Sequence, residues 1–235
     1  MVNNYYSLMQ YLGAHGLCYL CHGALPADGI VLCGDCAADL PGIGPSCVIC
    51  ASPVLHGQVC ADCLRAKQIP FDRSVSLYRY AYPANRLIID LKFHAQLQLA
   101  KFLGLRLAKR IVQLGLDRPE GLVPVPLHTS RMAARGFNQS CEIANTVAGE
   151  LGMPVFNQAC KRVRNTQPQH GLSADLRKQN LQRAFVPNPE HCRGISHVAI
   201  VDDVVTTGAT VLSLAAALGR AGIGRVDVWS CCRSI

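Results

Sequence analysis

The segment Val198–Val211, with the sequence VAIVDDVVTTGATV, constrains the fold of this chain more than any other part. The apolar run Val198–Val201 suits a central strand of a parallel sheet, and the apolar sequence after Gly208 suits a helix. Two acids, Asp202 and Asp203, and a loop of three threonines around a glycine lie between them. Ligands of open α/β sheets bind at the carboxyl ends of strands, which is where this loop must lie.

The composition of this loop favours a phosphate group as its ligand. Successive backbone N–H groups and hydroxyls can surround a phosphate, and the following helix adds the positive end of its dipole. The two carboxylates can accept hydrogen bonds from neighbouring sugar hydroxyls or help to hold a divalent metal. Simple helix capping would need only one polar residue, and the Walker pattern GxxxxGK[ST] is missing from the sequence. The candidate ligand-binding residues are Asp202, Asp203, Thr206, Thr207, Gly208, Ala209 and Thr210.

Strand-like and helix-like patterns alternate along the chain after residue 73. Alternation or apolar runs predict strands at residues 74–80, 121–127, 153–156, 197–205 and 225–231. Helical spacing predicts one or two helices over residues 85–114 and single helices over 140–151 and 209–221, besides a short helix within residues 1–16. This order predicts an α/β fold in which helices cover both faces of a parallel sheet.

The cysteines indicate metal binding. The chain has 13 cysteines, and eight of them form four CxxC pairs between Cys18 and Cys63. An odd count without an export signal argues against a disulfide framework, whereas the spacing suits two structural Cys₄ zinc sites. The pairs can combine sequentially or crosswise. The predicted zinc ligands are Cys18, Cys21, Cys33, Cys36, Cys47, Cys50, Cys60 and Cys63.

Charge divides the chain into two parts. All 23 basic residues lie after residue 64, together with 11 of the 15 acidic ones. We therefore expect a cysteine-rich zinc module over residues 1–66 and an anion-binding α/β domain over 67–235. A module with no Lys or Arg in its first 64 residues, whose Cys₄ zinc sites carry negative charge, should repel DNA phosphates and dock on the other domain or on a protein partner. The sequence has neither a membrane-spanning run nor a signal peptide, so we expect a cytoplasmic protein without membrane insertion.

The segment 198–211 closely resembles the phosphoribosyl pyrophosphate (PRPP) signature of type I phosphoribosyltransferases. The resemblance implies that Asp202 and Asp203 contact the ribose hydroxyls. It also implies that the loop from Thr206 to Thr210 holds the 5′-phosphate, with Mg²⁺ accompanying PRPP.

A wider resemblance covers nearly the whole chain. The runs LIIDLKFHAQ and VPVPLHTSRMAARGFNQS and the four CxxC pairs are similar to those of the ComF/GntX family. The match also includes the spaced set Thr166, Gln169, Leu172, Arg177, Asn180 and Phe185. This family is associated with competence and the use of incoming DNA. The resemblance implies a double zinc ribbon followed along the chain by a type I phosphoribosyltransferase-like domain.

Basic residues follow the predicted strand 121–127. Arg131 and Arg135 can reach over its carboxyl end, where a pyrophosphate would lie, and arginine suits such bidentate contacts. In the resembled fold this is the pyrophosphate loop, with Leu127 and His128. Residues 160–180 match a mobile lid that closes over the ligand, to which Thr166, Gln169 and Arg177 belong.

Three functions remain open from the sequence. The first is a ComF-like protein of DNA uptake that binds PRPP or a related ribose phosphate with Mg²⁺. The second is an active phosphoribosyltransferase of nucleotide metabolism, although no base or acceptor pocket is recognisable. The third is a PRPP-sensing regulator without catalysis. The basic groups also fit single-stranded DNA, so DNA or a DNA-processing protein is a candidate partner.

Overall fold

The computed structural model describes residues 16–25, 31–164 and 184–235. The chain divides into two compact units, Met1–Leu40 and Pro41–Ile235. The second group of four cysteines thus belongs to the larger unit, and the boundary at residue 66 stays a prediction. The helix predicted within residues 1–16 falls outside the described residues, apart from Gly16.

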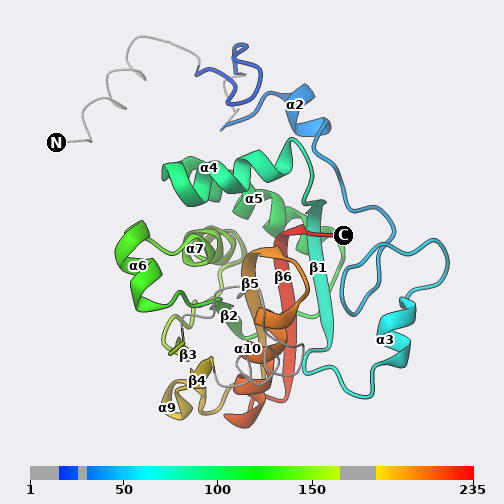
Figure 1. Cartoon of the computed structure of the whole chain (residues 1–235), viewed down its shortest axis with the longest axis vertical. Coiled ribbons are helices and arrows are strands. Elements are labelled where there is room, and N and C mark those ends of the chain that lie inside the picture. Colours follow the sequence, from blue (N-terminus) through cyan, green and yellow to red (C-terminus); the bar gives the residue numbers. More distant parts are fainter. Residues whose placement is uncertain (1–15, 26–30, 165–183) are drawn as a thin grey trace, which may run out of the picture. The chain divides into compact units, whose positions relative to one another are not determined.

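The larger unit contains a four-stranded parallel sheet in the order β1-β6-β5-β2 (Figure 1). Its strands are β1 (Arg73–Arg79), β6 (Arg225–Arg233), β5 (His197–Val205) and β2 (Gly121–Pro124). Six consecutive residues of β5, Val198–Asp203, are buried, as expected for a central strand that is covered on both faces. The fold class predicted from the sequence is confirmed: a parallel sheet flanked by helices, with a cysteine-rich region before it.

Helices cover the two faces of this sheet. On one face lie α5 (Leu97–Gln113) and α7 (Gln139–Leu151), and α4 (Ala84–His94) packs on α5. The helices α5 and α7 approach closely at Gly104, where a Cβ would lie 2.6 Å from Cβ of Thr146. On the other face, α10 (Ala209–Arg220) packs beside the hairpin β3 (Cys160–Arg162) and β4 (Phe185–Pro187). Short helices α2 (Gly34–Ala38), α3 (Ala61–Arg65), α6 (Thr129–Arg135) and α9 (Pro189–Cys192) complete the described elements.

Two predicted elements need correction. The strand predicted over 153–156 is a single bridge between Val155 and Leu122. The strand predicted over 121–127 ends at Pro124, because prolines at 124 and 126 have no N–H group for the ladder. The stretch 85–114, where the sequence predicts one or two helices, forms two that are separated at Ala95, which has a left-handed φ of 52°. The remaining predicted strands and helices after residue 73 are present, with ends shifted by at most two residues.

Within the part of the chain that the structure describes, every helix is too short or too polar to cross a lipid bilayer.

Candidate functional site

The acid pair lies near the carboxyl end of β5 and is buried. Asp202 and Asp203 are 7% and 3% exposed. The Asp202 carboxylate accepts hydrogen bonds from Ser140 Oγ at 3.1 Å and from the backbone N–H of Asp203 at 2.9 Å. Burial, followed by the charge of Asp203, raises the pKa of Asp202 to about 8. At neutral pH the site therefore holds about one proton that a cation or a ligand can displace.

Residues from two helices hold Asp203 in place. Lys92 of α4 forms an ion pair with Asp203, and Gln139 Nε2 of α7 donates a hydrogen bond to Asp203 Oδ1 at 3.3 Å. Burial acts to lower the pKa of Lys92, but the charge of Asp203 and their hydrogen bond outweigh it, so this pKa is raised. The ammonium of Lys92 therefore stays charged and neutralises one carboxylate.

Sequence reasoning did not assign roles to Lys92, Gln139 or Ser140. All three lie in runs that carried the wider resemblance, LIIDLKFHAQ for Lys92 and RGFNQS for Gln139 and Ser140. Their position in these runs marks them as candidates for a role in the site, but the spacing along the chain does not reveal that they contact the acid pair.

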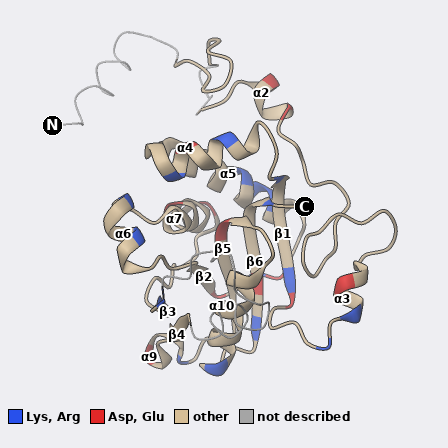
Figure 2. Cartoon of the chain, in the orientation of Figure 1, with Lys and Arg blue, Asp and Glu red and all other residues tan. Residues whose placement is uncertain are grey.

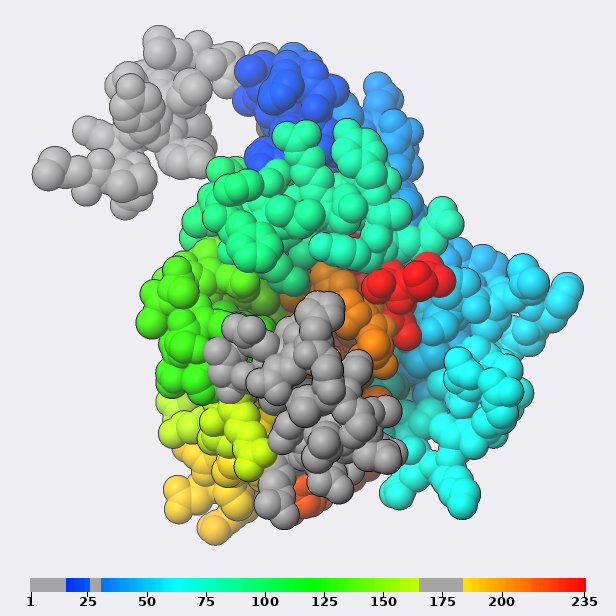
Figure 3. All heavy atoms as spheres, viewed as in Figure 1, coloured from blue at the N-terminus to red at the C-terminus, as the bar shows by residue number. Residues whose placement is uncertain are grey.

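The loop after β5 leads into α10 through Gly208. Gly208 has a φ of 79°, a left-handed conformation that strongly favours glycine, and it is the N-cap of α10. As a glycine, this N-cap residue has no side chain with which to cap the helix. A pocket is lined by Asp202, Val204, Val205, Thr206, Gly208, Ala209, Thr210 and Val211. The space-filling view shows this loop (orange) beside the C-terminal residues (red) on one face (Figure 3).

The structure thus brings most of the predicted ligand-binding residues to one pocket. Asp203 and Thr207 are next to it in the chain without lining it. The Thr207 hydroxyl instead accepts a hydrogen bond from Ala209 N at 3.4 Å. The Cβ that Gly208 lacks would meet only Leu212 Cδ1, at 3.9 Å, so the backbone conformation rather than crowding explains this glycine.

The predicted pyrophosphate loop is connected to the acid pair through α6. Leu127 lies in the irregular segment after β2, and His128 caps α6 by accepting a hydrogen bond from Ser130 N at 3.2 Å. Arg135, at the end of α6, donates a hydrogen bond to Gln139, which in turn contacts Asp203. Its guanidinium also lies 5.6 Å from the ring centre of Phe93.

A further arginine belongs to this neighbourhood. Arg162 of β3 lies over the ring of Phe185, 5.5 Å from its centre. Burial, followed by the charge of Arg131, lowers the pKa of Arg162, and the charge of Asp202 opposes that shift. The predicted lid residues Thr166, Gln169 and Arg177 lie outside the residues that the structure describes.

The eight cysteines of the CxxC pairs form two groups of four. Cys18, Cys21, Cys33 and Cys36 make up the first group, and Cys47, Cys50, Cys60 and Cys63 make up the second. The pairing is therefore sequential, which the sequence had left open. Within each group all sulfur atoms lie within 4.8 Å of one another.

The geometry of both groups fits a tetrahedral zinc ion. Sγ atoms of Cys21 and Cys33 are 3.7 Å apart, and those of Cys50 and Cys60 are 3.6 Å apart. Zinc–sulfur bonds of about 2.3 Å in a tetrahedron place the sulfurs about 3.8 Å apart. Burial would raise the pKa of Cys18 and Cys47, but backbone N–H groups outweigh it and lower these values to about 6 and about 7. Both groups fit structural zinc ions.

Comparison with known proteins agrees with this architecture. Residues 14–64 match the model of the double zinc ribbon domain. The chain is 38% identical to the DNA utilization protein YhgH of Salmonella typhimurium over 226 residues, which is 94% of this chain and 98% of that protein. It is 35% identical to competence protein F of Haemophilus influenzae, over 92% of this chain and 96% of the relative. The chain belongs to the ComF family. Competence protein ComFC of Bacillus subtilis is a more distant relative, 24% identical over 77% of this chain and 74% of that protein.

The charges of this ComF chain are arranged around the carboxyl end of β5. Figure 2 shows acidic residues on β5 and basic residues on α4 and α6. Lys92 of α4 forms an ion pair with Asp203. Arg131 and Arg135 belong to α6. A phosphorylated ligand would meet positive groups from these two helices and from the start of α10.

Metal analysis tests the two Cys₄ groups of this ComF chain. We expect about two zinc ions per chain and about one in either Cys36→Ser or Cys63→Ser, because three remaining thiolates leave a structural site incomplete. Elemental analysis of the purified protein measures this. Iron in place of zinc would contradict the assignment of the metal. Loss of both ions in each single variant would contradict the independence of the two sites.

Proposed function

We propose that this chain binds PRPP or a related ribose 5-phosphate together with Mg²⁺. The observation that carries the proposal is the position of the buried acid pair beside the N-terminus of α10, at the carboxyl end of β5. Anions bind at such helix ends, while carboxylates select cations or sugar hydroxyls. A ligand that combines a phosphate with hydroxyls or a metal satisfies both halves of the pocket.

The chemistry of each residue determines which part of the ligand it would contact. The backbone N–H groups and hydroxyls of Thr206–Thr210 would hold the 5′-phosphate, and Asp202 and Asp203 would accept from the ribose hydroxyls. Arg131 and Arg135 would contact a pyrophosphate group on the same ligand. Lys92 compensates the charge of Asp203 before the ligand arrives.

The acid pair suits Mg²⁺ because that ion prefers oxygen ligands and is usually held by one or two carboxylates and substrate phosphates. When bound, Mg²⁺ would neutralise the phosphates of the ligand. Displacement of the proton from Asp202 would accompany its binding, since the pKa of this carboxyl is raised to about 8.

We further propose that this binding serves the uptake or use of DNA. The relatives are named DNA utilization protein and competence protein F. The basic groups Arg131, Arg135 and Arg162 give single-stranded DNA a surface of opposite charge near the pocket. A DNA-processing protein is the alternative partner. Cytoplasmic location is part of the same proposal.

Turnover separates this proposal from its alternatives. An active phosphoribosyltransferase would release pyrophosphate from PRPP when a base or an amine is added. Binding without release, together with PRPP-dependent affinity for single-stranded DNA, would support the DNA-uptake function. Binding without release and without any effect on DNA affinity would favour a PRPP-sensing regulator. Calorimetry, a pyrophosphate assay and a DNA-binding titration at two salt concentrations make these measurements.

The pKa of Asp202 makes ligand affinity depend on pH. Because this pKa is raised to about 8 in the free protein, binding to the ionised carboxylate releases a proton below that value. We expect the affinity for PRPP·Mg²⁺ to rise about tenfold between about pH 7 and pH 9 and then to level off. The ligand's phosphates, with a pKa near 6, are already ionised in this range.

Calorimetry in two buffers of different ionisation enthalpy measures the released proton directly. An affinity that is constant from about pH 7 to 9, with no proton release, would show that Asp202 is not ionised by the ligand.

A further inference from the structure

One arginine side chain connects the second cysteine group to the loop after β5, residues 206–210, which we call the phosphate loop. Arg233, the last residue of β6, donates from Nε to the carbonyl of Cys50 at 3.1 Å and from Nη2 to Ser52 Oγ at 3.2 Å. Its Nη1 donates to the carbonyl of Val205 at 3.0 Å and to that of Thr206. The same guanidinium therefore contacts two segments. One is the turn that carries two of the predicted zinc ligands, residues 47–52, which we call the zinc-ligand turn, and the other is the junction of β5 with the phosphate loop.

The chemistry of this contact requires arginine. The guanidinium offers five N–H donors in a rigid plane, and here they reach acceptors on two separate segments. A lysine has one rotating ammonium and cannot keep both segments in the same relative position. The carbonyl of Val205 also accepts from Ser234 N at 2.9 Å, so the C-terminal segment and the loop are joined twice.

The zinc-ligand turn is ordered by its own contacts. Ala51 N donates to the carbonyl of Cys47 at 2.8 Å, and Cys47 N donates to the carbonyl of Ser52 at 2.7 Å. Cys47 and Cys50 both belong to the second group, so a bound metal would fix the two sides of this turn. A bound metal would therefore add to these contacts in fixing the Cys50 carbonyl, which Arg233 contacts.

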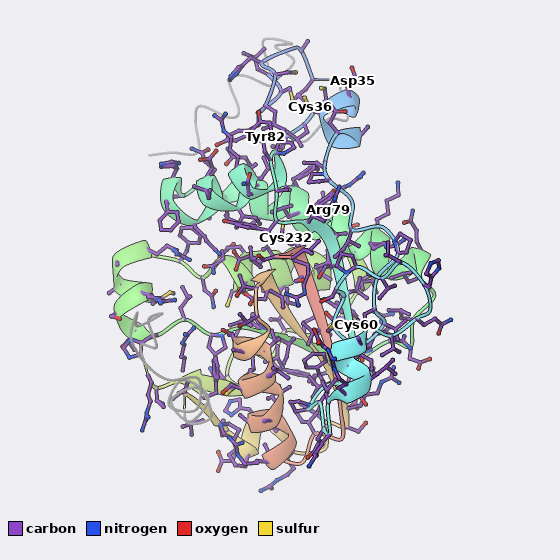
Figure 4. All side chains as sticks on the ribbon, turned by 45° about the vertical axis from the view of Figure 1, so that its right-hand side comes forward. Asp35, Cys36, Cys60, Arg79, Tyr82 and Cys232 are labelled. Carbon is purple, nitrogen blue, oxygen red and sulfur yellow. The ribbon has the colours of Figure 1, made fainter. Side chains whose placement is uncertain are left out.

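The second group is also fixed to the sheet that carries the pocket. Ser74 N of β1 donates to the carbonyl of Val48 at 3.1 Å, and Ile49 packs against the hydrophobic core. Figure 4 labels Cys60, at the start of α3, and Cys232, the neighbour of Arg233 on β6. All of these residues lie in the unit Pro41–Ile235. The second cysteine group and the pocket thus belong to one compact unit.

We propose that Arg233 is a positioning residue through which zinc at the second cysteine group sets the conformation of the phosphate loop. Loss of this zinc releases the Cys50 carbonyl, the guanidinium shifts, and the carbonyls of Val205 and Thr206 lose their donor. The loop then presents its N–H groups less well to a phosphate. The effect on ligand affinity rests on the proposed function, whereas the effect on loop order does not.

The first test measures the loop without any ligand. Hydrogen exchange of the amides in residues 204–210 is compared between the intact chain, Cys60→Ser in the second group and Cys36→Ser in the first. We expect exchange in these amides to become at least about tenfold faster in Cys60→Ser and to stay at the wild-type rate in Cys36→Ser. Equal exchange in all three proteins, or equal acceleration in both variants, would overturn the proposal.

The second test measures the coupling in both directions. In Arg233→Lys we expect a PRPP·Mg²⁺ affinity weaker by about tenfold, within the usual range of coupling between sites. Because coupling is reciprocal, saturating PRPP·Mg²⁺ should slow zinc release to a chromogenic chelator from the second group of the wild type. It should not slow this release in Arg233→Lys, an outcome that a merely stabilising arginine would not produce. Arg220→Lys, an exposed arginine at the far end of α10, is the matched control.

The two tests separate the inference from the function. If the wild type does not bind PRPP·Mg²⁺, the proposed function fails and loop exchange alone decides the role of Arg233. If the wild type binds but ligand slows zinc release equally in Arg233→Lys, the positioning role is wrong and the function stands. Should Arg233→Lys fold poorly, Ser52→Ala removes one acceptor of the guanidinium and should show a smaller change in the same direction.

Discussion

Replacing Asp202 and Asp203 together by asparagine is expected to weaken PRPP·Mg²⁺ binding by at least about a hundredfold. Each carboxylate offers charge-assisted hydrogen bonds of about 1.5 to 3 kcal/mol that an amide cannot reproduce. Asparagine keeps the shape of the buried pair and leaves an oxygen for Ser140 and Gln139, which now contact the carboxylates. Calorimetric titration in Mg²⁺ measures the loss.

A folded control is needed because both side chains are buried. Circular dichroism and the urea midpoint of Asp202→Asn/Asp203→Asn should show an intact fold. The alanine pair is the second variant, and it should lose binding in the same way. Retained affinity in a folded asparagine variant would mean that the acid pair does not contact the ligand.

Removal of Lys92 is expected to produce the second large effect, this time on stability. In Lys92→Met the carboxylate of Asp203 loses its ion-pair partner, although the side chain of Asp203 is only 4% exposed. Breaking a buried ion pair costs about 3 to 5 kcal/mol, and the 23% exposure of Lys92 reduces that to about 2 to 3 kcal/mol here. The free energy of unfolding from urea titration near neutral pH measures the loss.

The pH dependence of this loss has a defined sign. The pKa of Lys92 is raised, so its stabilising charge is present throughout the acidic and neutral range and is lost only above the ordinary lysine pKa. The stability difference should therefore persist through neutral pH and shrink only as the pH rises above the ordinary lysine pKa. Lys101→Met, an exposed lysine of α5, is the matched control. A loss equal to that of Lys101→Met would show that the ion pair does not stabilise the fold.

Much of the fold follows from local sequence patterns. The run Val198–Asp203 is apolar and then acidic, and the structure places it as a buried central strand whose acids lie at the carboxyl end. The helices α7 and α10 begin and end within one residue of their predicted bounds, because their apolar spacing is regular. The prediction of a strand at 153–156 was wrong because a run of four apolar residues does not show how many backbone hydrogen bonds it will form with a neighbouring strand.

The contacts of the site were less accessible to sequence reasoning. Lys92, Gln139 and Asp203 come from three elements that are distant in the chain, so no periodicity brings them together. The guanidinium of Arg233 contacts Cys50 across 183 residues of sequence. The combination of the CxxC pairs was also undecided, because spacing alone permits both sequential and crossed sites.

We propose that the pocket at the end of β5 takes a ribose phosphate with a divalent cation. Calorimetric titration of the intact, zinc-loaded chain with PRPP in Mg²⁺ tests it most directly. We expect saturable binding of one PRPP per chain, release of a proton near neutral pH and loss of both signals in Asp202→Asn/Asp203→Asn. Absence of binding to both PRPP and ribose 5-phosphate would contradict it.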